Sequence, residues 1–229
     1  LCAFPAHALI RDALAVHETF GTLRLRMLLI SVKQEALHHH AEDRLIAGRD
    51  LKITSSGTIR NSGTLAAGQR AELQANTIQN TVGTLQAGHL ALNANEDILN
   101  QSGLLKGDTV SLAAGRDITL NSKATRFAGS NVRNTAITGV SRVDAGELTI
   151  KAGRDLNAQA AQISASDDAT LQAGRDINLS TLTESFHMSW RANARNKGKL
   201  GVSEEHGTQL GVGGNLNLFA GQDINTRAA

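Results

Sequence analysis

The chain has 229 residues and a nearly even charge balance, with 23 Lys and Arg against 21 Asp and Glu. That balance does not give the electrostatic footprint of a typical nucleic-acid-binding protein, so no nucleic-acid partner is expected. The one cysteine, Cys2, excludes an intramolecular disulfide framework. No apolar stretch approaches the length of a membrane-spanning helix. Aromatic residues make up 3% of the chain, so Ala, Leu, Ile and Val must fill the core.

Residues 1–44 form a segment without repeats, and they hold five of the eight histidines. Apolar residues between Leu9 and Phe20 have the spacing of a helix, and residues 23–32 have the composition of a strand. The sequence leaves open whether this segment is a cap, a different domain or a misassigned start. Because the first residue is Leu and no signal peptide follows, the chain is expected to be an internal fragment of a longer protein.

From Leu45 onward the chain repeats a tetrapeptide, Ala-Gly-Arg-Asp, each time followed by an aliphatic residue. A chain that winds in coils and makes one such corner per turn explains the recurrence. Four copies and a near-copy, Ala-Gly-Gln-Asp, occur at Ala47–Asp50, Ala114–Asp117, Ala152–Asp155, Ala173–Asp176 and Ala220–Asp223. The residues predicted to build these structural corners are Gly48, Asp50, Gly115, Asp117, Gly153, Asp155, Gly174, Asp176, Gly221 and Asp223.

The spacing of two independent markers predicts about 20 residues per coil. Gly48, Gly68 and Gly88 recur at this interval, and the longer step from Gly115 to Gly153 is interpreted as two turns of 19. A second marker, an Ile-x-Asn motif followed by Gly, keeps the same period. Its asparagines are Asn61, Asn80 and Asn100. Such a period is typical of solenoid proteins, in which each unit packs only on its neighbours.

Between the corners, apolar residues alternate with small or polar ones, as in Leu51-Lys52-Ile53. This is the period of a strand with one buried face, whereas Gly, Asn, Thr and Ser interrupt every candidate helix. The absence of proline after Pro5 agrees with an uninterrupted hydrogen-bonded ladder. Together these features predict an all-β fold, a right-handed parallel β-helix over residues 45–229.

Each corner residue has a predicted structural role. Glycine is expected to bend the chain by adopting positive φ, and aspartate to accept hydrogen bonds from backbone N–H groups just beyond it. Stacked coils would place Asp above Asp, and the adjacent Arg is expected to offset that repulsion. Asn61, Asn80 and Asn100 are expected to bond to local backbone or to form a short amide ladder.

One long spacing breaks the rhythm, because the interval from Gly174 to Gly221 is more than twice the period. The excess lies within residues 182–213 and is predicted to leave the solenoid as an insertion loop. This loop holds the candidate surface-binding residues, in which aromatic rings accompany cations: Phe186, Trp190, Arg191, Arg195 and Lys197. The alternative is an excursion whose aromatic side chains pack back onto the rod.

The repeats resemble the haemagglutinin repeats of filamentous haemagglutinin-like proteins, the large exoproteins of two-partner secretion in Gram-negative bacteria. The Ala-Gly-Arg-Asp-Ile/Leu-x-Leu and Ile-x-Asn-x-x-Gly-x-Leu corners carry the resemblance across residues 45–229, and the run Gly213–Ile224 is especially typical. The resemblance implies an adhesin filament that attaches to a receptor or glycan on a host or neighbouring cell. In close relatives the same filament is the passive stalk of a contact-dependent growth-inhibition toxin, and that role is the alternative.

The resemblance also implies secretion through an outer-membrane partner. Family members carry an N-terminal secretion domain with an Asn-Pro-Asn-Gly motif, whereas this chain has Phe4-Pro5-Ala6. That partner would therefore act through parts of the protein outside this chain. The implied location is the outer-membrane surface of a Gram-negative bacterium, or the medium around it.

Enzymatic and metal-dependent functions find little support in the residues. Glycoside chemistry needs two carboxylates on either side of one bond, whereas these carboxylates repeat identically at each turn. His38-His39-His40 is a run of adjacent residues rather than a set of converging zinc ligands, and calcium-binding β-rolls have a nine-residue period. Cys2 has no identifiable base. The sequence therefore predicts no enzyme, no metal site and no cofactor.

Overall fold

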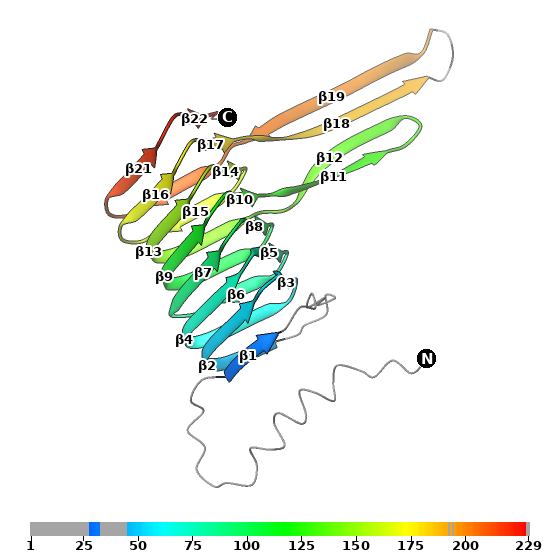
Figure 1. The fold of residues 1–229 in the computed structure, drawn as a ribbon. Coiled ribbons are helices and arrows are strands. Elements are labelled where there is room, and N and C mark those ends of the chain that lie inside the picture. Colours follow the sequence, from blue (N-terminus) through cyan, green and yellow to red (C-terminus); the bar gives the residue numbers. More distant parts are fainter. Residues whose placement is uncertain (1–27, 33–44, 192, 194, 228–229) are drawn as a thin grey trace, which may run out of the picture.

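The structure, a computed structural model, describes residues 28–32, 45–191, 193 and 195–227. These residues contain strands and no helix (Figure 1), and hence no helix that could cross a membrane. Cys2, the run His38-His39-His40 and the helix expected between Leu9 and Phe20 lie outside the described residues.

Two parallel sheets form the sides of a rod. The larger sheet contains β1 (Leu28–Val32), β2 (Leu45–Ser55), β4 (Thr64–Ala75), β6 (Thr84–Gln86), β7 (His89–Ala94), β9 (Leu104–Ala114), β13 (Arg142–Ala152), β15 (Gln162–Ala165), β16 (Ala169–Ala173), β20 (Gln209–Val212) and β21 (Leu216–Ala220). The smaller sheet contains β3 (Thr58–Asn61), β5 (Thr77–Thr81), β8 (Ile98–Gln101), β10 (Ile118–Asn121), β14 (Leu156–Gln159), β17 (Ile177–Ser180) and β22 (Ile224–Thr226).

Each coil pairs in parallel register with the next, so equivalent residues stack along the rod. Leu51 lies opposite Ala71, Ala71 opposite Leu90, and Leu90 opposite Val110. The sequence separation of these partners equals the period of the two sequence markers. The prediction of a parallel β-helix with one coil per marker period is therefore confirmed.

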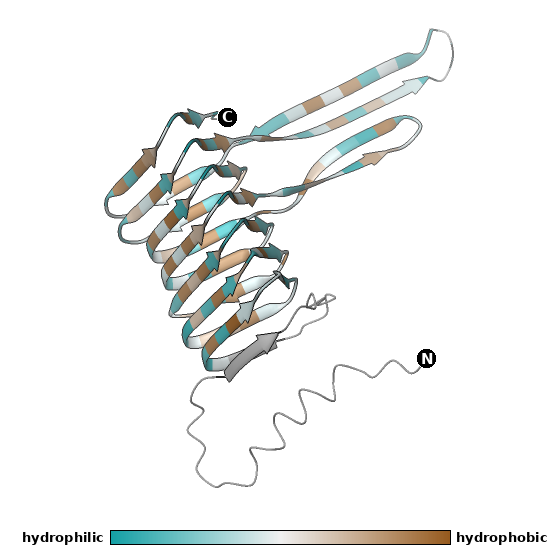
Figure 2. Cartoon of the chain, in the orientation of Figure 1, coloured by the Kyte–Doolittle hydropathy of each residue, from teal (hydrophilic) through white to brown (hydrophobic). Residues whose placement is uncertain are grey.

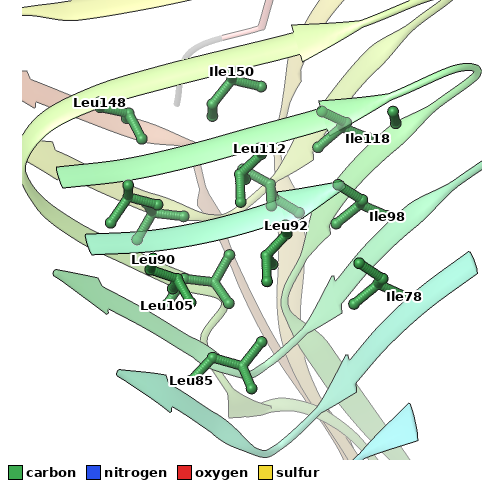
Figure 3. Packing of buried hydrophobic residues seen from close by; sticks show 14 of the residues in the cluster. Ile78, Leu85, Leu90, Leu92, Ile98, Leu105, Leu112, Ile118, Leu148 and Ile150 are labelled. Carbon is green, nitrogen blue, oxygen red and sulfur yellow. The ribbon is translucent and has the colours of Figure 1, made fainter. Parts of the chain in front are cut away.

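The interior is a column of aliphatic side chains (Figure 3), and hydrophobic residues alternate with hydrophilic ones along the strands of the rod (Figure 2). Leu92, Leu112 and Ile150 stack from the larger sheet, and Ile98 and Ile118 face them from the smaller sheet; all five are almost fully buried. Burial of each such side chain contributes roughly 1.5–3 kcal/mol to folding. The alternation of buried and exposed residues in β7 and β13 explains why the period of two predicted these strands correctly.

Each coil has three corners, which we number in chain order. The first bends the larger sheet, the second leads to the smaller sheet, and the third leads back. First-corner glycines are Gly48, Gly68, Gly88, Gly107 and Gly146. Second-corner glycines are Gly115, Gly153, Gly174 and Gly221. Third-corner asparagines are Asn61, Asn80 and Asn100.

The repeated tetrapeptide occupies two of these corners rather than one. Ala114 pairs with Ala152, and Ala173 pairs with Ala220, so those copies share the second corner. The copy at Ala47–Asp50 lies within the paired part of β2 and β4, at the first corner. The prediction of one equivalent corner per turn is therefore wrong for Ala47–Asp50. The same short motif therefore occurs at similar backbone bends in the first and the second corner.

The whole stretch from Gly115 to Gly153 forms one coil, because Ala114 pairs directly with Ala152. The interpretation as two turns of 19 is wrong. The additional residues form an antiparallel hairpin of β11 (Lys123–Ala128) and β12 (Val132–Gly139). A hairpin of about one coil's length preserves the apparent period of the sequence and so hides the insertion.

The second-corner glycines are required by close approach between coils and not by their dihedral angles. No described glycine has positive φ, contrary to the prediction. A Cβ on Gly153 would collide with the carbonyl oxygen of Gly115, and a Cβ on Gly174 would collide with that of Gly153. Positive φ occurs at the third corner instead, in residues that are not glycine: Val82, Ser102 and Ala160.

Replacing Gly153 with Ala is expected to lower the free energy of unfolding by about 1–3 kcal/mol, because the added methyl pushes two coils apart. The matched control is Gly211→Ala, since a Cβ on Gly211 meets no atom within 4 Å. That control should be neutral or stabilise by up to about 1 kcal/mol. Urea unfolding followed by circular dichroism measures both, and equal stabilities would contradict the close-approach explanation.

Candidate functional site

The third corner of the rod is held by a ladder of buried amides. Asn61 Nδ2 donates to Asn80 Oδ1 at 2.8 Å, and Asn80 Nδ2 donates to Asn100 Oδ1 at 2.8 Å. Asn80 Nδ2 also donates to the carbonyl oxygen of Gly83 at 2.9 Å. Both expected roles, the local backbone bond and the ladder, therefore occur together. The ladder ends where Asn100 Nδ2 donates to Ser141 Oγ at 2.9 Å.

The second corner carries a ladder of ion pairs between successive coils. Arg116 donates to both carboxylate oxygens of Asp97, at 3.2 and 2.8 Å. Arg154 likewise contacts both oxygens of Asp117, and Arg175 those of Asp155. These three arginines thus neutralise the aspartate of the coil below, as the expected charge offset requires.

The same aspartates accept backbone hydrogen bonds from the next coil. Asp155 N donates to Asp117 Oδ1 at 3.2 Å, and Asp223 N donates to Asp176 Oδ1 at 3.1 Å. The expectation of acceptance from N–H groups just beyond, in the same coil, is wrong at these positions. The N–H groups that follow each aspartate already donate to carbonyl groups of the next coil. The carboxylate therefore accepts its hydrogen bond from the neighbouring coil along the rod axis. Asp50, at the first corner, lies outside this ladder.

These contacts shift the ionisation of the second-corner aspartates. The hydrogen bond from Arg154 lowers the pKa of Asp117, and the hydrogen bond from Arg175 lowers the pKa of Asp155. Partial burial opposes the shift in both cases, and the bond from the next coil's backbone reinforces it. Among the described residues, no three His, Cys, Asp or Glu side chains are placed to share a metal ion. The corners are therefore built for stacking.

A separate sheet projects from the rod and is the candidate functional site (Figure 1). It consists of the β11–β12 hairpin and a second hairpin of β18 (Leu182–Arg191) and β19 (Lys197–His206). The two hairpins are joined edge to edge because β12 pairs with β18 in antiparallel register, with Val132 opposite Met188 and Thr135 opposite Ser185. We call this four-stranded structure, ordered β11-β12-β18-β19, the projecting sheet.

Both hairpins leave the rod at the third corner, in coils separated by one intact coil. The intact third corner between them is the turn from Gln159 to Gln162. Coils stack about 4.8 Å apart, which is also the spacing of strands within a sheet. Two coils therefore match the width of one hairpin, and this match brings β12 beside β18.

Hydroxyl side chains close the opened corners at the base of each hairpin. Ser122 Oγ donates to the carbonyl oxygen of Ala160 at 2.6 Å, and Ser141 N donates to Ser122 Oγ at 3.0 Å. At the second hairpin, Thr208 Oγ1 lies 3.0 Å from the carbonyl oxygen of Ser180. The backbone groups freed by each insertion are thus satisfied within the rod.

Glu184 ties the two hairpins together near the rod, where the pairing of β12 with β18 ends. Its carboxylate accepts a hydrogen bond from Ile137 N at 2.5 Å and contacts His206 Nε2 at 3.1 Å. This side chain takes the place of the next ladder bond between the hairpins. The relative position of the hairpins is therefore fixed at their root.

One face of the projecting sheet is apolar. Directly paired residues point to the same side of a sheet and successive residues to opposite sides, which places Phe127, Val132, Phe186, Met188, Trp190, Leu200 and Val202 on one face. Five of these side chains are exposed: Phe127 by 62%, Val202 by 59%, Trp190 by 50%, Leu200 by 48% and Phe186 by 37%. We call this surface the apolar face.

The opposite face is basic. It presents Arg126, Arg133, His187, Arg191, Lys197 and Lys199. No Asp or Glu occurs within residues 123–139 or 185–203, whereas Glu184, Glu204 and Glu205 lie near the rod. The sheet therefore has positive charge along its outer part and negative charge at its root. We call this second surface the basic face.

The structure divides the residues predicted from the loop at 182–213. Phe186 and Trp190 lie on the apolar face, whereas Arg191 and Lys197 are paired across the strands on the basic face. Arg195 lies in the turn at the tip, where its N–H donates to Asn193 Oδ1 at 3.0 Å. Trp190 lies over Gly198, where a Cβ would collide with the indole ring. The aromatic ring thus packs within the hairpin instead of on the rod.

Sequence reasoning missed the other half of the projecting sheet. Arg126, Phe127 and Arg133 come from β11 and β12, which the apparent period of 19 concealed. One signal was available, because residues 123–139 lack the repeat's Asp and Ile-x-Asn markers. Counting missing markers instead of residues would have located this insertion.

Comparisons with known protein families agree with this architecture. Residues 127–198 match the hemagglutinin repeat family, and residues 74–134 match a family of repeats of unknown function. The first match begins near the end of β11 and ends at the start of β19, so it covers β12, β18 and the coils between them. Searches of curated proteins and of solved structures gave no match.

The fold and the projecting sheet define a parallel β-solenoid repeat protein with two hairpins inserted at the third corner. Together with the two family matches, they support a filamentous haemagglutinin-like repeat protein. Proteins with this repeat are typically secreted or associated with the cell surface.

Replacing the buried Asn80 with Ala is expected to lower the free energy of unfolding by about 2–3 kcal/mol, because neighbouring amide groups lose their buried partners. The matched control is Asn95→Ala. Asn95 Nδ2 makes the same kind of bond between coils, to Asn76 Oδ1 at 2.9 Å, but in an exposed position. That control should cost less than about 1 kcal/mol. Equal losses, measured by urea unfolding, would show that burial of the ladder is unimportant.

Acid is expected to destabilise the rod through Asp117 and Asp155. Their pKa values are lower in the folded protein than the ordinary 3.8. Their contribution is therefore complete above that value and is lost as the pH falls toward the folded pKa. The double variant Asp117→Asn/Asp155→Asn should show a smaller drop in urea midpoint between pH 6 and pH 3.

The control for this titration is Asp108→Asn, because Asp108 is exposed at the first corner and lies outside the arginine ladder. It should retain the acid sensitivity of the parent chain. A double variant as acid-sensitive as the parent would show that the ladder does not contribute to the pH dependence.

Proposed function

We propose that this chain is a segment of a secreted or surface-exposed adhesin, in which the rod holds the projecting sheet against the surface of another cell. The observation that carries the proposal is that two separately inserted hairpins pair to form one sheet. Insertions from separate coils are paired through β12 and β18 and clamped by Glu184, although neither adds to the core of the rod. A defined surface held outside the core is what a contact function requires.

The proposed contact surface is the basic face together with the tip of the second hairpin. Arg191 and Lys197 are paired across the strands there, and Arg195 follows in the turn. With acidic residues confined to the root, the field of the outer sheet favours anionic partners. The proposed partner is therefore an anionic receptor or glycan on a host or neighbouring cell.

The proposed location is the outer-membrane surface of a Gram-negative bacterium or the surrounding medium, reached with an outer-membrane secretion partner. That partner would act through parts of the protein outside this chain. Support for this location comes from the hemagglutinin repeat match, whose family is typically secreted or surface-associated.

The proposal assigns no enzymatic role to the chain. The aspartates Asp97, Asp117 and Asp155 are each bound by an arginine of the next coil. A carboxylate paired in this way is a poor general acid or base, because the ion pair lowers its pKa and occupies its oxygens. The repetition of the same pair at successive coils also suits stacking better than catalysis at one position.

Binding of the labelled 229-residue chain to bacterial and epithelial cells tests the proposal. The variant Arg191→Glu/Lys197→Glu should weaken binding at least about tenfold, because it reverses charge at the proposed contact. The control Lys106→Glu/Lys151→Glu makes the same change of net charge on exposed positions of the rod, and it should bind as the parent does.

Equal weakening by both variants would indicate attraction by net charge alone and would contradict a defined contact surface. Absence of binding by the folded parent chain would favour the passive stalk of a toxin-delivery filament. Circular dichroism of every variant establishes that the β-helix is intact.

A further inference from the structure

The apolar face of the projecting sheet has no covering element within the described chain. Phe127, Phe186 and Trp190 stand on it beside Leu200 and Val202, and all five are exposed. A sheet with one apolar face normally buries that face against another layer. We propose that the covering layer is the same face of a second copy of this chain, so that two projecting sheets pack into a sandwich. This inference goes beyond the proposed adhesion and does not depend on it.

The size of the apolar face suits such an interface. An aromatic side chain offers about 150–250 Å² of surface. With the exposed fractions given above, the five residues leave roughly 500 Å² per copy in contact with water. Two copies would bury about 1,000 Å² in total, which reaches the lower range of specific interfaces. A patch of this size is in the range of the largest apolar patches on monomeric proteins, which are often functional.

The distribution of charge favours a second copy over a lipid surface. Arg126, Arg133 and Lys199 stand on the basic face, and side chains in a sheet are roughly perpendicular to it. If lipid covered the apolar face, these cations would point away from the anionic headgroups. In a sandwich of two apolar faces, the same cations point outward into water on both sides.

Charge also selects the orientation of the two copies. Arg195 lies in the turn at the tip of the second hairpin, whereas Glu184 and Glu204 lie at the root, on the apolar face itself. A two-fold axis through the centre of the sheet would place each basic tip over the acidic root of the other copy. A parallel arrangement would instead bring the two basic tips together, which like charges disfavour.

This antiparallel arrangement also gives Trp190 a place to bind. A shallow hollow near the root of the sheet is lined on the apolar face by Asn134, Ala136, Phe186 and Val202 and by the carboxylates Glu184 and Glu204. Two-fold symmetry sends Trp190 of each copy toward the hollow of the other. Aromatic anchors seated in pockets supply much of the binding energy of protein interfaces. The sandwich thus contains two equivalent anchors.

Sedimentation velocity of the 229-residue chain over about 1–100 µM tests the proposal. We expect a monomer–dimer equilibrium with a dissociation constant roughly in the micromolar range. The variants Val202→Glu and Trp190→Ser should each raise that constant at least about tenfold. The matched control is Ser189→Glu, which places the same charge beside Trp190 but on the basic face, opposite Lys199. It should leave the constant within about twofold of the parent.

Three results would overturn the proposal. The first is a parent chain that stays monomeric across the whole range. The second is a dimer that both apolar-face variants leave intact, which would place the interface elsewhere. The third is a monomer that floats with vesicles of phosphatidylglycerol and phosphatidylcholine and loses this binding on Val202→Glu, which would assign the apolar face to lipid. Circular dichroism separates loss of the dimer from loss of folding in each variant.

Discussion

Stacking in register is the constraint on which the rest of this structure depends. Each side chain of the rod lies one strand spacing from its own counterpart in the next coil, so a residue must be compatible with a copy of itself. Leu and Ile meet that condition by packing, and asparagine meets it because an amide both donates and accepts. Aspartate does not, since a carboxylate above a carboxylate is repelled. Where an arginine precedes the second-corner aspartate, it supplies the missing donor to the coil below, as Arg154 does for Asp117.

The same constraint explains how much of the fold was predictable. Period-two alternation and a marker in each coil reflect stacking directly, so they predicted the parallel β-helix and its strands. They could not distinguish one corner from another, because the first and second corners use the same tetrapeptide in different places. Nor could they reveal why glycine occupies the second corner. The reason is the close approach of a carbonyl group from the coil below, such as the carbonyl of Gly115 beneath Gly153. A contact between residues so distant in the chain has no local sequence signal.

The candidate site was predicted only in part, for a related reason. The insertion near 182–213 disturbed the spacing enough to be noticed, whereas the hairpin of β11 and β12 replaced nearly one coil's worth of residues. The aromatic and basic residues were expected to form one cluster because they are close in sequence. In a strand, even and odd positions point to opposite faces, so Phe186 and Trp190 separate from Arg191. Applying the period of two inside the loop would have predicted this separation.

The two hairpins inserted at the third corner fit together because the width of a hairpin equals the spacing between the insertions. A hairpin is two strands wide, and the two insertions begin two coils apart. Because coils and strands have the same spacing, the second hairpin begins where the first one ends. Hairpins on adjacent coils would compete for the same space, and hairpins three coils apart would leave a strand-wide gap. A solenoid can therefore support a second, antiparallel sheet that extends along the rod axis while its strands project away from the rod, provided that insertions occupy alternate coils. Lengthening or shortening a single hairpin changes the reach of this sheet without disturbing the rod that bears it.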